Sequence, residues 1–147
     1  MDISFCIVNL NAKKYLSNCL KSIPGSTKLD SIEIIVVDNN SYDGSANFLI
    51  EKYPDIKLIR NRRNKGYTKA MNQALRSSNG EYRVVLNPDT FLMHDSIDIL
   101  IDQMRSDRSI GIVGPKVINA DGSFQKSCRR GIARPAAVFS YFLGLSE

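Results

Sequence analysis

Residues 36–45 read VVDNNSYDGS, an apolar run that stops abruptly at small polar and acidic residues. Residues 86–90 read LNPDT and repeat this pattern further along the chain. A buried parallel strand looks like this when it delivers carboxylates to the open edge of a sheet, and in open α/β sheets ligands bind outside the carboxyl ends of the strands. The two strand ends therefore predict a site for a nucleotide and a divalent cation.

The sequence around these two strand ends alternates between strand and helix patterns. Strands are expected at 3–8, 32–37, 56–59 and 82–86, helices at 12–22, 45–53, 69–77 and 96–104, and further short strands at 110–113 and 116–118. Repeated alternation predicts βαβ units with right-handed crossovers, and hence a mostly parallel sheet with helices on both faces. At residues 119–122, which read NADG, a hairpin turn and then a less regular segment are expected.

The composition fits one soluble α/β domain. The chain has 147 residues, of which 43% are hydrophobic and 24% charged, enough for a single core. Its net charge of +5 is compatible with an anionic substrate, a membrane surface or nucleic acid and does not choose among them. Three widely spaced cysteines without a C-x-x-C motif disfavour structural zinc and a disulfide framework, so a reduced, cytoplasmic setting is expected. The amino terminus lacks a signal-peptide pattern, and no stretch approaches the ~20 apolar residues of a membrane span.

Two aspartates near the end of the second expected strand have different expected roles. Asp38 ends the apolar run, and its carboxylate could accept a hydrogen bond from a pyrimidine ring N–H or from ribose hydroxyls. Ligand contact is favoured for Asp38 because no helix cap is needed one residue after Val37. Asp43 is placed to cap the helix that follows.

Asp89 is the candidate metal ligand. In Asn87-Pro88-Asp89 a proline fixes the backbone between two polar side chains at a strand end. Mg²⁺ and Mn²⁺ take oxygen ligands in proteins, often one or two carboxylates together with substrate phosphates. Asn87 offers a neutral oxygen beside the single acid. The alternative interpretation is a turn that binds nothing.

A third candidate segment is Asn64-Lys65-Gly66-Tyr67, followed by Asn72. A glycine at the entry to a helix lets backbone N–H groups approach an anion. The chain has neither a Walker motif nor G-x-G-x-x-G, which disfavours a P-loop and a dehydrogenase-type dinucleotide fold. The basic residues within 60–65 are either a solvated surface or a charge that attracts a pyrophosphate, and Arg129-Arg130 has the same two interpretations. His94 is the only histidine, so paired-histidine metal sites and a Ser–His–Asp triad lack support.

Taken in order, these motifs resemble the family 2 glycosyltransferases of the GT-A fold, particularly the rhamnosyltransferase-like branch. The matching positions are Val8-Asn9-Leu10-Asn11, Tyr15-Leu16, Cys19-Leu20, Ser22-Ile23, Val36 to Ser41, Asp43-Gly44-Ser45, Asn64, Gly66, Tyr67, Ala70, Asn72, Leu86 to Thr90, Gly111, Val113 to Lys116, Asp121-Gly122 and Gln125. The resemblance implies an α/β fold of GT-A (Rossmann-like) type, truncated after its donor-binding half. Residues 1–118 would be the nucleotide-sugar-binding domain, and 119–147 the incomplete start of an acceptor-side region.

The resemblance also implies an activity, namely inverting transfer of a sugar from a nucleoside-diphosphate sugar to a hydroxyl of a saccharide or lipid-linked acceptor, in cell-surface polysaccharide synthesis. Asp89 would hold Mn²⁺ or Mg²⁺ at an Asp-x-Asp position whose first acid is replaced by Asn87. The expected nucleotide-sugar-binding residues are Val8, Asn9, Asn11, Asp38, Asn40, Asn64, Gly66, Asn72, Asn87 and Asp89. The catalytic base is expected beyond Glu147, so this chain alone is expected to bind without efficient turnover.

Other functions remain open at this stage. A non-catalytic nucleotide or nucleotide-sugar binding module would show the same strand ends. Nucleic acid is not an expected partner, because the basic residues lack interleaved stacking aromatics. A nucleotidyltransferase would normally show a glycine-rich loop near the first strand, which is absent after Asn9. The apolar segment 135–145 leaves a homo-oligomer and a peripheral contact with the inner face of the membrane as alternatives.

Overall fold

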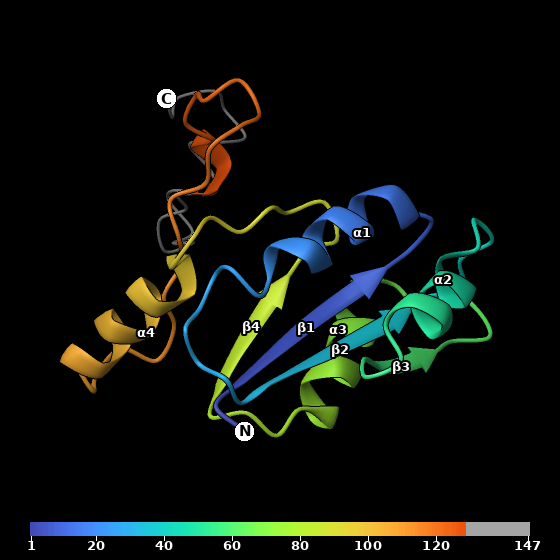
Figure 1. The fold of residues 1–147 in the computed structure, drawn as a ribbon, viewed down its shortest axis with the longest axis horizontal. Coiled ribbons are helices and arrows are strands. Elements are labelled where there is room, and N and C mark those ends of the chain that lie inside the picture. The colour runs from blue at the N-terminus through green and yellow to red at the C-terminus, as the bar shows by residue number, and fades with distance from the viewer. Residues whose placement is uncertain (129–147) are drawn as a thin grey trace, which may run out of the picture.

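The computed structural model describes residues 1–128 (Figure 1). In chain order the elements are β1 (Ile3–Asn9), α1 (Lys13–Ser22), β2 (Ile32–Asp38), α2 (Ser45–Lys52), β3 (Lys57–Arg60), α3 (Tyr67–Ser77), β4 (Tyr82–Leu86), α4 (Ser96–Ser106) and the 3₁₀ helix η1 (Lys126–Cys128). These bounds lie within about two residues of those expected up to residue 106. The predicted alternation of strands and helices is confirmed.

The strands of the described residues form one parallel sheet in the order β3-β2-β1-β4. Asn9 is aligned with Asp38, and Asp38 with Arg60, so the carboxyl ends of β1, β2 and β3 lie side by side. On the other side of β1, Leu86 is aligned with Ile7, which brings the end of β4 to the same edge. The predicted α/β class with a parallel sheet is confirmed.

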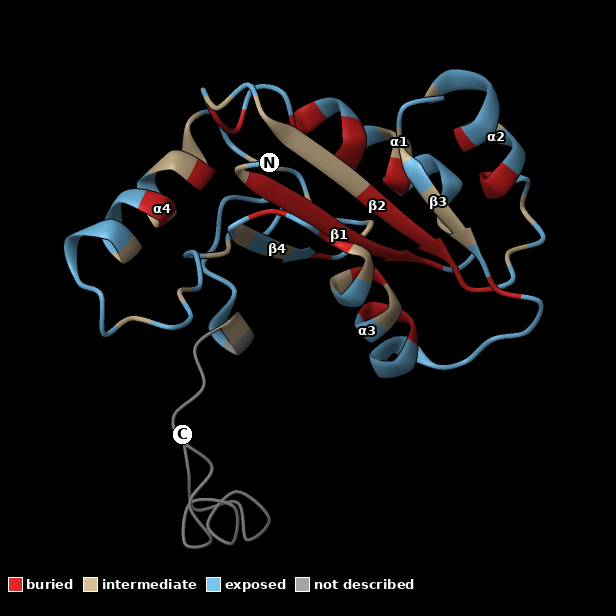
Figure 2. Ribbon diagram, turned by 90° about the horizontal axis from the view of Figure 1, so that it is seen from below, coloured by how far each residue is buried: buried red, intermediate tan, exposed pale blue. Residues whose placement is uncertain are grey.

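Helices cover both faces of the sheet, as Figure 2 shows from below. One core cluster joins α1, α2 and α4 to one face, with Phe5 and Val36 among its buried strand residues. The other packs α3 against Cys6, Val8 and Ile35 on the opposite face. Strand β1 is buried along its whole length, which explains its nearly continuous apolar sequence. Successive residues of a strand point to opposite faces, and this alternation continues into the polar strand ends.

The strands expected at 110–113 and 116–118 are wrong, since the structure has no strand there. Ile112 is 93% exposed, and an apolar run without a neighbouring strand to pair with stays irregular. The turn expected at 119–122 is confirmed, because Ile118 and Phe124 form an antiparallel bridge around it and Gly122 N–H donates to Asn119 O. Of the expected second domain, residues 129–147 lie outside the described part of the chain, as does the Arg129-Arg130 pair.

No helix within residues 1–128 is long and apolar enough to cross a membrane.

Gly80 lies just before β4, at the end of the sheet opposite the polar strand ends. We expect Gly80→Ala to destabilise the fold. Its N–H donates to Ser4 Oγ at 2.7 Å, and Ser4 Oγ donates in turn to Glu33. A Cβ at position 80 would lie 2.5 Å from Ser4 Oγ and 2.6 Å from Ser4 N, so this junction would have to shift. The expected loss is about 1–3 kcal/mol of unfolding free energy, measured by urea denaturation. Gly111→Ala is the control, because a Cβ there meets nothing within 4 Å, and equal effects of the two substitutions would contradict the prediction.

Candidate functional site

The carboxyl edge of the sheet contains the point where the strand order reverses. The chain runs from β1 to β2 to β3 on one side, and β4 then lies on the other side of β1. In open α/β sheets ligands bind in the crevice at such a point. The carboxyl ends of β1 and β4 flank this point (Figure 1), and they carry Asn9 as the last residue of β1 and Asp89 shortly after β4.

At the ends of β1 and β2, Asn9 and Asp38 form a buried polar centre. Asn9 is fully buried and Asp38 is 2% exposed. Asn9 Nδ2 donates to Asp38 Oδ1 at 3.1 Å and to Ser41 Oγ at 3.0 Å, while Ser41 N–H donates to Asp38 Oδ2 at 3.2 Å. Because the carboxylate only accepts, it fixes which end of the Asn9 amide faces it. Asn9 Oδ1 is left buried without a partner among the described residues.

This geometry corrects the reason given for expecting ligand contact at Asp38. The sequence suggested that no local cap is needed there, yet both carboxylate oxygens of Asp38 have internal partners, one of them the Ser41 N–H. The side chain therefore holds the turn after β2 and joins it to β1. The contact of Asp38 with a nucleobase stays a prediction. It requires the buried carboxylate of Asp38 to become accessible to the ligand.

The loops after β1 and β2 are joined by further hydrogen bonds. Asn11 N–H donates to Ser41 Oγ at 3.0 Å, and Asn11 Oδ1 accepts from Tyr42 N–H at 2.8 Å. Asn11 (φ 52°) and Asn40 (φ 74°) are both left-handed, a conformation that asparagine tolerates better than most residues. Both are exposed at the carboxyl edge, where the sequence predicted nucleotide contacts.

Asp43 lies one residue before Gly44, the N-cap residue of α2, so the cap expected at Asp43 is displaced by one residue, and the Asp43 carboxylate contacts the first residues of both α2 and α1. It accepts from Ser45 N–H and Oγ and from Lys13 N–H at 2.8 Å. Burial raises its pKa, but the hydrogen bonds from Ser45 and Lys13 outweigh burial and hold the pKa below the usual 3.8. The carboxylate thus serves two helix N-termini at once.

Asp43→Asn is expected to lose about 0.3–1 kcal/mol of unfolding free energy at neutral pH, because it removes a negative charge from two helix N-termini. Because the folded-state pKa is lowered, the stabilisation is present above the unfolded value and is lost as the pH falls through the folded value. The variant and the wild type should therefore converge in urea denaturation as the pH drops below 3.8. Asp55→Asn, at an exposed position, is the control. A stability gap at Asp43 that stays constant with pH would contradict this account.

An acidic residue without a hydrogen-bond partner among residues 1–128, Asp89, follows the end of β4. Asn87 and Asp89 are exposed, and the Asp89 carboxylate accepts no hydrogen bond from residues 1–128. Helix α1 holds the segment around it, since Cys19 Sγ donates to Asn87 O at 3.7 Å and Leu92 N–H donates to Ser22 Oγ at 3.0 Å. Burial, followed by the charge of Asp89, raises the pKa of Cys19 to about 12, so this thiol stays protonated.

The surroundings of Asp89 suit a divalent cation only if a bound diphosphate supplies further oxygen ligands. Within residues 1–128, no group of three or more His, Cys, Asp or Glu could hold a metal ion. A divalent cation bound through one or two carboxylates and substrate phosphates needs no such group. Asp89 and its neutral neighbour Asn87 are compatible with a metal that arrives with a diphosphate, and the metal site stays a prediction.

The loop after β3 contains two of the predicted residues, Asn64 and Gly66. Asn64 Oδ1 accepts from Gly66 N–H at 2.8 Å, and Gly66 (φ 78°) turns the chain into α3. The side chain that holds this loop is one the sequence analysis missed, namely Asn39, which is 2% exposed and bonded to Asn64 and to Lys65 N–H. Strand alternation could have indicated it, because Asn39 must face away from Asp38.

Of the remaining predicted residues, one is buried in the core and one is exposed on a helix. Val8 is buried against α3, so it can offer the site little beyond backbone atoms. Asn72 is exposed on α3. The carboxyl edge thus brings Asn9, Asp38, Asn87 and Asp89 to neighbouring strand ends, with Asn9 and Asp38 buried and Asn87 and Asp89 exposed, whereas Asn72 lies on α3.

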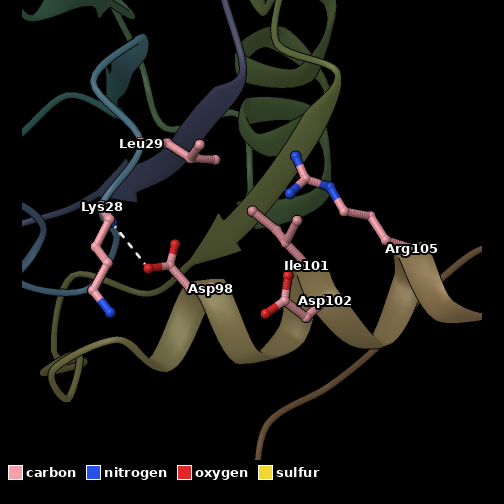
Figure 3. Close-up of a pocket in the computed structure, with 6 residues that line it drawn as sticks. All are labelled: Lys28, Leu29, Asp98, Ile101, Asp102 and Arg105. Atoms are coloured by element: carbon pink, nitrogen blue, oxygen red, sulfur yellow. Dashed lines mark hydrogen bonds between the residues drawn. The ribbon is translucent and has the colours of Figure 1, made fainter.

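A separate hollow of about 240 Å³ lies between α4 and the segment before β2 (Figure 3). It is lined by Lys28, Leu29, Asp98, Ile101, Asp102 and Arg105. Lys28 N–H donates to Asp98 there, and Arg105 stacks on Tyr82 at the start of β4. The hollow therefore lies toward the amino ends of the strands and shares no residue with the predicted site.

Comparison with known proteins gives consistent matches. The model of the family described as "Glycosyl transferase family 2" matches residues 4–143. A chondroitin synthase of Escherichia coli is 32% identical over 76% of this chain and 16% of its own length. An N-acetylglucosaminyl-diphospho-decaprenol L-rhamnosyltransferase of Mycobacterium tuberculosis is 27% identical over 67% of this chain and 36% of its own.

Among solved structures, a mannosyltransferase from Pyrobaculum calidifontis in complex with GDP-Man and Mn²⁺ aligns with a TM-score of 0.65 at 22% identity. The alignment covers 80% of this chain and 35% of that protein. At this identity the match confirms the fold. The chain spans well under half the length of these proteins.

Proposed function

The chain belongs to glycosyl transferase family 2, and from that premise we propose that its carboxyl edge binds the nucleoside-diphosphate sugar from which a sugar is transferred to a hydroxyl acceptor. The observation that carries the proposal is the pair of polar strand ends on either side of β1. One is the buried centre of Asn9 and Asp38, and the other is the exposed Asn87 and Asp89.

The span of this edge supports the proposal. Neighbouring strands lie about 4.8 Å apart, so the ends of β2 and β4 are separated by roughly 10 Å. A nucleoside diphosphate can reach across such a distance with its base at β2 and its phosphates at β4. In this arrangement Asp38 and the loops it holds line the base end, and Asp89 lies at the phosphate end.

The chain's own residues would bind and orient the donor. Asp89 would hold Mn²⁺ or Mg²⁺ together with the diphosphate, with Asn87 as a neutral oxygen donor beside it. A bound cation of this kind neutralises charge on a departing diphosphate. The mannosyltransferase match, whose complex contains Mn²⁺, supports a divalent cation as the cofactor. Lowered metal affinity is expected, because Asn87 replaces a second acid.

We extend the proposal to an inverting transfer in cell-surface polysaccharide synthesis, on the cytoplasmic side of the membrane, with a saccharide or lipid-linked acceptor. The chondroitin synthase and rhamnosyltransferase relatives support this class of product. An inverting displacement needs a carboxylate that takes the acceptor's proton.

Calorimetric titration of the chain with UDP, dTDP and GDP, each with and without Mn²⁺, tests the proposal. We expect one nucleotide to bind more tightly than the others, with an affinity that rises when Mn²⁺ is added. Absence of binding by all three nucleotides in both conditions would overturn it.

A further inference from the structure

Asp38 and Asn39 are consecutive and equally buried, but they hold different parts of the edge. Asp38 joins β2 to the loop after β1 through Asn9 and Ser41. Asn39 faces the other side of the sheet and joins β2 to residues 61–66, which we call the β3 loop. The end of β2 is thus the common anchor of two loops.

Both polar atoms of the Asn39 side chain have hydrogen-bond partners in the β3 loop. Its Oδ1 accepts from Asn61 Nδ2 at 3.1 Å and from Lys65 N–H at 3.0 Å, and its Nδ2 donates to Asn64 Oδ1 at 2.7 Å. The backbone N–H of Lys65 can only donate, so the amide orientation of Asn39 is determined by the network. Asn39 therefore binds the β3 loop at its first, fourth and fifth residues.

The network continues into helix α3. Asn61 and Gln73 exchange two amide hydrogen bonds, at 2.9 and 3.1 Å, and Asn61 N–H donates to Asp38 O at 2.9 Å. These contacts tie the first residue of the β3 loop to β2 and α3, and the contacts of Asn39 with Asn64 and Lys65 hold its other end. The loop surface itself is exposed and carries Arg62, Arg63 and Lys65, which form no ion pair with an acid of residues 1–128.

The position of the β3 loop on the edge determines which part of a ligand it can meet. It follows β3, which lies beyond β2 and three strands from β4, or roughly 14 Å from the end that carries Asp89. A diphosphate held at Asp89 would therefore lie away from this loop, while a base placed at β2 would lie beside it. The basic residues of the loop are then not the ligands of a pyrophosphate held at Asp89.

We propose that Asn39 is a positioning residue for the base end of the site, holding the β3 loop in the conformation that distinguishes one nucleobase from another. The inference rests on the proposed function. Asn39 does not touch the ligand in this account. It presents the exposed backbone and side chains of residues 62–66 as a preformed wall, so that the loop need not be ordered when the nucleotide binds.

The test compares Asn39→Ala and Asn39→Asp with the wild type and with Asn47→Ala, an exposed asparagine on α2. Calorimetry measures the affinities for UDP, dTDP, GDP and inorganic pyrophosphate in the presence of Mn²⁺. Amide hydrogen exchange measured by NMR follows Lys65 N–H in the loop and Phe5 N–H in the core as a folding control. Asn39→Asp keeps the acceptor for Lys65 N–H and loses the donor to Asn64.

We expect Asn39→Ala to lower the affinity for the preferred nucleotide about tenfold and to level the affinities for the three bases, with pyrophosphate affinity unchanged. Lys65 N–H should exchange faster in this variant while Phe5 N–H keeps its protection, and Asn39→Asp should retain protection at Lys65 and part of the base preference. An unchanged preference among the three bases in Asn39→Ala would overturn this inference and leave the proposed function standing. An equal loss of affinity for pyrophosphate, or loss of exchange protection at Phe5 N–H, would do the same. Failure of the wild type to bind any nucleotide would instead overturn the proposed function, and the inference with it.

Discussion

Asp89→Ala is expected to abolish the gain in nucleoside-diphosphate affinity that Mn²⁺ provides. Asp89 is exposed at the end of β4, its carboxylate is uncommitted, and it is the acid that can meet a cation at this strand end. One carboxylate with phosphate oxygens suffices for such a cation, and removal of that carboxylate leaves only neutral donors such as Asn87. We expect a loss of at least about tenfold in the presence of Mn²⁺, or about 1.4 kcal/mol, and little change without it.

Calorimetry with and without Mn²⁺ measures the effect. Asp102→Ala is the matched control, because Asp102 is also an exposed aspartate but lines the hollow beside α4 (Figure 3). An Mn²⁺-dependent gain that survives in Asp89→Ala, or one that disappears equally in Asp102→Ala, would place the cation elsewhere.

Asn9→Asp is expected to be the most destabilising single-atom change at the site. It would set two carboxylates against each other where Asn9 Nδ2 now donates to Asp38 Oδ1 at 3.1 Å, at a fully buried position. Like charges at this distance raise the pKa of one of the acids, and an uncompensated buried charge costs about 3–5 kcal/mol. The loss should be largest at pH 7 and should shrink as the pH falls, since one shared proton restores a donor.

Urea denaturation at pH 7 and pH 5 measures this cost. Asn11→Asp is the control, because Asn11 is exposed and the new carboxylate still accepts from Tyr42 N–H. We expect that variant to stay within about 0.5 kcal/mol of the wild type. Equal stability of the two variants would show that the centre of Asn9 and Asp38 does not hold the edge together.

The fold was predictable because its strands have strong local signals. The run at 32–37 is apolar except for Glu33, as expected for a strand covered by helices on both sides. The run at 110–113 looked similar over four residues, but Ile112 has no strand to pair with and is exposed. Strand pairing is a property of the whole chain, and a short apolar run carries no information about its partner.

The position of the candidate residues at the strand ends was predictable, whereas the role of each residue stays a prediction. The sequence indicated which residues collect at the carboxyl ends of the strands, and Asp89 is exposed there as expected. The motif alone did not distinguish Asn39 from Asn40, which are identical in type, although Asn39 is 2% exposed and Asn40 lies on the surface. That difference comes from the loop after β3, which supplies the partners of Asn39 from more than twenty residues away.

Amide chemical-shift mapping of the chain titrated with UDP and with GDP, each with Mg²⁺, tests the central claim most directly. The account predicts that the shifts caused by the nucleotide that binds gather in the loops after β1, β2, β3 and β4, with Asn11, Gly66 and Asp89 among them. Shifts that gather instead around Lys28, Asp98 and Arg105 beside α4, at the opposite end of the strands, would contradict it.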